Sequence, residues 1–169
     1  SSAASDVYKR QLQHPDGRTA LEKGDVDAWA GLDPHMAASE LQAGSRLLYR
    51  NKDFNSFGVV SVTEAFAKQH PETIATVIKA YEQARHWAVA HPEAFAKLLA
   101  DESKLPLDVA ELQLSRTDLS APQLNAQDVT ASKAAAPILV SEELVKRGVD
   151  VNQVIDQLID PSFGKASIE

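Results

Sequence analysis

The stretch Val26-Asp27-Ala28-Trp29-Ala30-Gly31-Leu32-Asp33-Pro34-His35 decides the fold that we expect for this chain of 169 residues. Its first part, residues 26–32, is short, mostly apolar and bounded by glycine and proline, which is typical of a buried β-strand. Asp33 and Pro34 then suit the N-cap and the first position of a helix. A strand that runs directly into a helix is the building unit of an α/β fold.

Further elements are predicted on both sides of this stretch. Apolar and β-branched residues favour two more strands, at 46–49 and 57–62. Proline and glycine punctuation with helical periodicity predicts the helices, which we place at 18–23, 33–43 and 64–69, from 71, from 92, and at 107–114, 126–147 and 150–159. We expect a turn at 14–17 and a bend at Pro137. The prediction is therefore an α/β fold with few strands and a helix-rich C-terminal part.

Composition excludes several classes of protein. Hydrophobic residues make up 44% and charged residues 24%, which is close to the average for globular domains and argues against wholesale disorder. The net charge of −7, from 17 basic and 24 acidic residues, argues against a nucleic-acid partner. The absence of cysteine excludes disulfides, thiolate metal sites and a cysteine nucleophile.

Three candidate ligand-binding residues lie in the stretch that decides the fold. Ligands of open α/β sheets bind beyond the carboxyl ends of strands, where helix N-termini offer free N–H groups. Asp33 either caps the helix or faces a ligand as an acceptor or a latch. Trp29 either belongs to the core or forms the wall of a ligand pocket. His35 is either solvated or points toward the same crevice.

No metal site, cofactor site or catalytic motif is predicted. His86 and His91 are five residues apart, so they miss the spacing of four that places two zinc ligands on one helix face. The sequence has no Gly-x-Ser-x-Gly, no phosphate-binding glycine loop and no Gly-x-Gly-x-x-Gly. We therefore expect a protein that is not an enzyme.

Several longer motifs resemble those of one family. Residues 16–29, DGRTALEKGDVDAW, resemble the DGRAAFxxGxVDAW stretch of aliphatic sulfonate-binding proteins, the solute-binding components of ABC importers. Residues 32–35, LDPH, are similar to the WDPY segment of that family, with Leu32 and His35 in place of its aromatic residues. Residues 66–72, FAKQHPE, resemble its FAxKHPE helix junction, and residues 149–163 resemble its C-terminal helix and tail.

The resemblance implies a type II periplasmic-binding fold, in which two α/β lobes close around a ligand. Residues 12–169 would be its C-terminal half, and residues 1–11 are set aside as foreign or disordered. Because the only methionine is Met36, we expect either a processed chain or a missing N-terminal part with a leader peptide. The implied protein is periplasmic, binds a small anion such as an aliphatic sulfonate for sulfur metabolism, and docks on an ABC permease.

Two alternatives stay open beside import. The resemblance extends to a fungal thiamine-pyrimidine synthase of the same fold, an enzyme that relies on histidine and a cysteine-rich segment. A sensing or interaction domain without transport is the other alternative. The changes at Leu32 and His35 leave the ligand open, either as another alkanesulfonate or as a different small anion.

Overall fold

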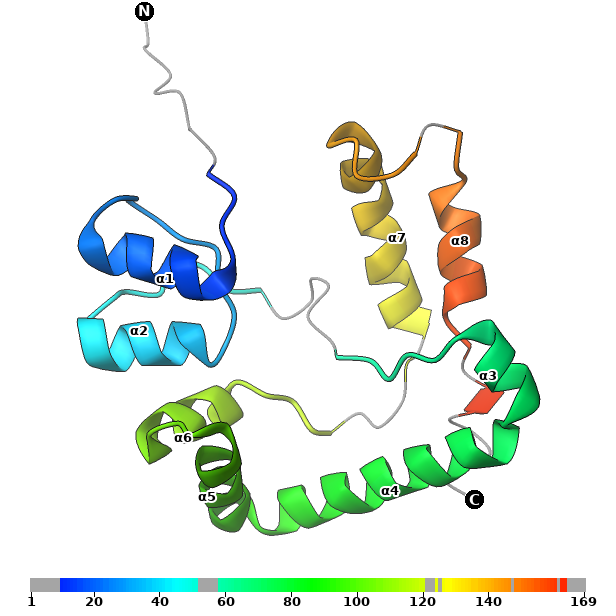
Figure 1. Cartoon of the computed structure of the whole chain (residues 1–169), viewed down its shortest axis with the longest axis horizontal. Helices are drawn as coiled ribbons and strands as arrows, with labels where there is room; N and C mark the ends of the chain where they lie inside the picture. The colour runs from blue at the N-terminus through cyan, green and yellow to red at the C-terminus, as the bar shows by residue number, and fades with distance from the viewer. Residues whose placement is uncertain are drawn as a thin grey trace, which may run out of the picture. The chain divides into compact units, whose positions relative to one another are not determined.

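A computed structural model of the chain describes residues 10–51, 58–120, 124, 126–146, 148–160 and 162–163 (Figure 1). These residues form eight helices: α1 (His14–Lys23), α2 (His35–Ala43), α3 (Glu64–Gln69), α4 (Pro71–Ala90), α5 (Pro92–Ser103), α6 (Leu107–Ser115), α7 (Ala126–Ser141) and α8 (Val151–Leu158). The prediction of a helix-rich chain is confirmed.

Local signals explain where most helices begin and end. The Thr63 hydroxyl accepts a hydrogen bond from the Phe66 N–H at the start of α3, and the Asp150 carboxylate accepts one from the Gln153 N–H at the start of α8. Gly24 and Gly44 end α1 and α2 with φ of 77° and 68°, in the left-handed region that glycine tolerates. Such capping depends on residues within a few positions, so the sequence reveals it.

Two predicted helix boundaries are wrong. Helix α1 begins at His14 instead of residue 18, because Pro15 and Asp16 fit the first turn of a helix as well as they fit a separate turn. Helix α7 ends at Ser141 instead of residue 147. Glu143 adopts a positive φ of 55° there, and the Leu144 N–H bonds the Leu139 carbonyl, which closes the helix early.

The three predicted strands are also wrong within the part of the chain that the structure describes. Residues 26–32, 46–49 and 58–62 form neither helix nor strand, and residue 57 of the third lies outside the described residues. A strand exists only when its backbone groups pair with a neighbouring strand. The apolar pattern indicates the tendency to form a strand, but the pairing partner is not found among the described residues.

The chain divides into two compact units. The first contains the described residues up to Leu48 together with Glu93–Thr117, and the second contains those of Tyr49–Pro92 and those from Asp118 onward. In the first unit, α2 packs on α1 and α6, and Ala37, Ala38 and Val109 form its buried cluster. In the second, α7 packs beside α8 (Figure 1) around a cluster of Ala136, Val151 and Ile155.

The cores of both units are built mainly from small side chains. Eight of the twelve buried apolar residues among those described are alanines. Many larger apolar side chains stay exposed, and none of the described helices is long and apolar enough to cross a membrane.

Candidate functional site

Trp29 lies in the first unit with its indole against two glycines. A Cβ added to Gly17, in α1, would lie 2.4 Å from the indole Nε1. A Cβ added to Gly31 would lie 2.3 Å from Cη2 at the other end of the ring system. Both distances are too short for any side chain, so the two glycines allow the indole to lie directly on the backbone.

His14 contacts the same indole from the first turn of α1. The two rings meet edge to face, with their centroids 6.5 Å apart and an interplanar angle of 64°. The Nδ1 atom of His14 is buried and has no hydrogen-bond partner among the described residues. A buried polar atom without a partner is rare in native structures and is a ready contact for a ligand or a water.

A pocket of about 230 Å³ opens beside this indole. Trp29 and Gly17 contribute to its wall, and the remaining lining comes from two short stretches of chain. The full lining is Arg10, Gln11, Leu12, Gly17, Val26, Ala28, Trp29 and Ala30. The lining therefore includes an arginine, a glutamine and a tryptophan, which are residue types suited to a small ligand with one charged end.

Asp33 is engaged at the start of α2. Its Oδ1 accepts a hydrogen bond from the Ala37 N–H at 2.9 Å and lies 3.5 Å from Nη1 of Arg116, at the end of α6. Arg116 also pairs through Nη2 with Glu40 of α2. The N-cap position itself is Pro34, so Asp33 accepts a backbone N–H of α2 from the residue before the N-cap. The prediction of Asp33 at the N-cap and Pro34 at the first helical position is therefore wrong by one residue, although Asp33 does accept a helix N–H.

His35 is the first residue of α2 and is partly buried. Its imidazole makes no hydrogen bond or ion pair with any other residue in the described ranges. Neither His35 nor Asp33 belongs to the lining of the pocket beside Trp29. The three candidate residues thus fall into two places, Trp29 at the pocket and the other two at the start of α2.

Sequence reasoning missed Arg10, Gln11 and Arg116. Arg10 and Gln11 lie in the segment 1–11 that was set aside, shortly before the start of α1 at His14. Arg116 pairs with Asp33 and Glu40, which are far away in the sequence, and no local sequence pattern predicts such a contact. The short spacing between Trp29 and Gly31 was a usable signal, because glycine beside a large aromatic residue permits close packing.

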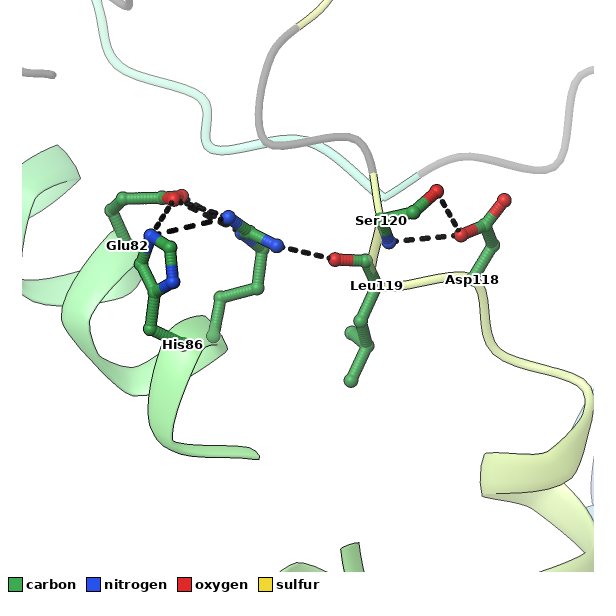
Figure 2. Close-up of polar contacts among 6 residues, drawn as sticks. Glu82, His86, Asp118, Leu119 and Ser120 are labelled. Carbon is green, nitrogen blue, oxygen red and sulfur yellow. Dashed lines mark hydrogen bonds and ion pairs between the residues drawn. The ribbon is translucent and has the colours of Figure 1, made fainter. Parts of the chain in front are cut away.

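A second polar cluster lies in the second unit. Figure 2 shows Glu82 and His86 on one helix, α4, facing the segment that carries Asp118, Leu119 and Ser120. Arg85, also on α4, donates through Nε to Glu82 Oε2 at 2.9 Å and through Nη1 to the Leu119 carbonyl at 2.7 Å. Nε2 of His86 lies 2.9 Å from Glu82 Oε1.

The contacts of Arg85 explain the electrostatics of this cluster. The hydrogen bonds that Arg85 donates hold the pKa of Glu82 below its ordinary value, and Glu82 in turn raises the pKa of Arg85. Arg85 hydrogen-bonds both Glu82 and the Leu119 carbonyl, so it links residue 119 to α4. Among the described residues, no group of three or more acidic or histidine side chains could hold a metal ion.

Comparison with known proteins gives one family and two relatives. The sequence model of the NMT1/THI5-like family matches residues 4–95, a range that starts inside the segment 1–11. A protein of Bacillus subtilis (strain 168) is 27% identical over 166 residues, which cover 97% of this chain and 49% of the relative. A protein of Escherichia coli (strain K12) is 29% identical over 155 residues, which cover 90% of this chain and 49% of the relative.

Both relatives carry the same provisional name, aliphatic sulfonates-binding protein. The chain spans about half the length of each of them. No solved structure is significantly similar to the chain.

Proposed function

Because this chain belongs to the NMT1/THI5-like family, we propose that it is part of a solute-binding protein that captures an aliphatic sulfonate for an ABC importer. The provisional names of the two relatives support this ligand class. Since the chain spans about half of each relative and the family match starts at residue 4, we assign the chain from residue 4 onward to the C-terminal half of a two-lobed periplasmic protein. Its partners would be the ligand and the membrane permease.

The pocket beside Trp29 is the observation that carries this proposal. Its volume of about 230 Å³ is below the usual range for drug-sized ligands, so it suits a ligand of few atoms. A short alkanesulfonate has one anionic end and one apolar end. The Arg10 guanidinium can donate two parallel hydrogen bonds to sulfonate oxygens, and the Trp29 indole offers an apolar surface to the alkyl chain.

The acidic net charge does not oppose such a ligand. Recognition depends on the local donors, and the Arg10 side chain at the pocket is a donor suited to an anion. The family match begins at residue 4, so Arg10 lies within the part of the chain that the family model matches.

Asp33 and His35 have a different role in this proposal. Both groups that contact the Asp33 carboxylate, the Ala37 N–H and the Arg116 guanidinium, belong to the chain itself. Asp33 would therefore fix the start of α2 at the edge of the ligand cleft. His35, with no polar partner among the described residues, is the one of the two that could reach a ligand.

The proposed function is binding without chemical change, so the alternative of a synthase-like enzyme predicts a different outcome. Titration of the complete protein with ethanesulfonate tests binding, and mass spectrometry of the recovered ligand tests for turnover. Trp29→Leu should weaken the affinity about tenfold or more, since it removes an aromatic wall. The matched control is Trp87→Leu on α4, outside the pocket. Equal affinities of the two variants, or a chemically altered ligand, would refute the proposal.

A further inference from the structure

The chain passes between its two compact units at three points, namely after residues 48, 92 and 117. The last of these crossings begins at a residue that is attached to the first unit. The Thr117 N–H donates to the Leu114 carbonyl, and the Thr117 hydroxyl donates to the Gln113 carbonyl, so Thr117 is held at the end of α6. Thr117 therefore moves with the first unit.

The first residues beyond this crossing are attached to α4 in the second unit (Figure 2). Nη1 of Arg85 donates to the Leu119 carbonyl at 2.7 Å, while Nε of the same guanidinium donates to Glu82 at 2.9 Å. Asp118 accepts the Ser120 N–H at 2.9 Å and the Ser120 hydroxyl at 2.6 Å, which closes a tight turn around Leu119. The side chains of Arg85 and Glu82 are only 19% and 14% exposed, so water competes weakly for these hydrogen bonds. Leu119 therefore moves with the second unit.

The crossing after residue 92 is attached to the same helix. His91 ends α4 and directly precedes Pro92, the first residue of α5. The His91 N–H donates to the Trp87 carbonyl at 2.9 Å, and the imidazole stacks on the Trp87 indole with the ring centroids 5.4 Å apart. Arg85 and His91 are six residues apart, which is about 9 Å along a helix. The C-terminal part of α4 therefore carries the anchors of two of the three crossings.

We propose that Arg85 is a positioning residue that confines rotation between the two units, at the last crossing, to residues 117–119. A hinge consists of a few residues that absorb the change in φ and ψ, and anchors on both sides determine which residues these are. Without the guanidinium, the rotation would extend beyond Leu119, and a longer free segment has more conformations to lose when its ends are brought together. The inference goes beyond the proposed function, because the anchor acts whichever solute is bound.

Electron–electron double resonance between two spin labels tests the anchor in the full chain. Because the chain has no cysteine, Glu111→Cys on α6 and Lys79→Cys on α4 place one label in each unit. We expect Arg85→Ala to broaden the distribution of distances between the labels by about 1.5-fold or more, since the reach of a free segment grows with the square root of its length. Glu82→Gln leaves Arg85 in place but removes the charge that orients it, so this variant should broaden the distribution less.

Arg18→Ala is the matched control. Arg18 also pairs with a glutamate of its own helix, Glu22, and the two side chains are 23% and 26% exposed. Arg18 lies in α1, far from the last crossing in the sequence, so its loss should leave the width of the distribution unchanged. Far-UV circular dichroism of each variant checks that the helices are retained, so that a broader distribution reports on the anchor and not on unfolding.

The inference is overturned if Arg85→Ala leaves the width unchanged, or if Arg85→Ala and Arg18→Ala broaden it equally. If Arg85→Ala loses its helices, Glu82→Gln takes its place, and an unchanged width in Glu82→Gln overturns the inference as well. Failure of the complete protein to bind a sulfonate would refute the proposed function alone, because the widths are measured without ligand.

Discussion

Arg116 and Asp33 form an ion pair between the end of α6 and the start of α2, with Nη1 of Arg116 3.5 Å from Oδ1 of Asp33. The same Oδ1 accepts the Ala37 N–H of α2. This one carboxylate oxygen therefore accepts a backbone N–H of α2 and also links the start of α2 to the end of α6, which is far away in the sequence. Both side chains are mostly buried, with 12% and 18% of their surfaces exposed, so water screens this ion pair only partly.

Arg116→Ala should destabilise the first unit. The change leaves the carboxylates of Asp33 and Glu40 without their cation, and we expect the free energy of unfolding to fall by about 1–3 kcal/mol. Urea unfolding followed by circular dichroism measures this. Arg46→Ala is the control, because Arg46 is exposed and forms no ion pair with any described residue. Equal unfolding midpoints for the two variants would show that the ion pair contributes nothing.

Asp33→Ala should reduce stability by about 1 kcal/mol, because it removes the acceptor of the Ala37 N–H. Asp33→Asn keeps an oxygen at this position and should lose less. We expect the sulfonate affinity of the complete protein to be unchanged in both variants. If Asp33→Ala instead lowers affinity while the melting temperature stays constant, Asp33 contacts the ligand directly.

Gly17→Ala should displace the Trp29 indole, since the new Cβ would lie 2.4 Å from Nε1. We expect a loss of about 1–3 kcal/mol in stability, as for other overpacked sites. In a Trp87→Phe background, the emission maximum of the remaining tryptophan should shift to the red as the indole becomes more exposed. Gly58→Ala is the matched control, because no atom lies within 4 Å of its added Cβ. Identical spectra for both alanine variants would rule out the close packing.

The Glu82–Arg85 pair should make stability dependent on pH. Arg85 lowers the pKa of Glu82 in the folded chain, so folding favours the ionised carboxylate. The resulting stabilisation is complete above the ordinary value of 4.5 and is lost as the pH falls through the lower folded-state pKa.

Urea midpoints of the wild type and Glu82→Gln, compared from about pH 6 down to about pH 3, measure this contribution. The two midpoints should differ at the upper end and converge in acid. Glu102→Gln, an exposed position on α5 with no ion pair among the described residues, is the control and should follow the wild type throughout. A difference between wild type and Glu82→Gln that persists unchanged in acid would contradict the assignment.

The helices could be predicted because their determinants are local. Residues 64–69 were predicted as they occur, since Thr63 and Pro71 bound them. The local sequence of residues 26–32 could not decide whether a strand forms there, because strand formation depends on a paired neighbour. Packing of Trp29 on Gly17 and the pairing of Arg116 with Asp33 also depend on the tertiary fold. Trp29 was recognised as a candidate pocket wall, whereas Arg10 and Gln11 were missed because they lie in the excluded segment.

Calorimetric titration of the complete protein with a short alkanesulfonate, with the alkyl carboxylate of equal length as a control, tests the central claim most directly. The proposed function predicts saturable binding of the sulfonate at one site, weaker binding of the carboxylate, and a marked loss of sulfonate affinity in Arg10→Ala. Absence of saturable sulfonate binding, or an affinity that Arg10→Ala leaves unchanged, would contradict the account.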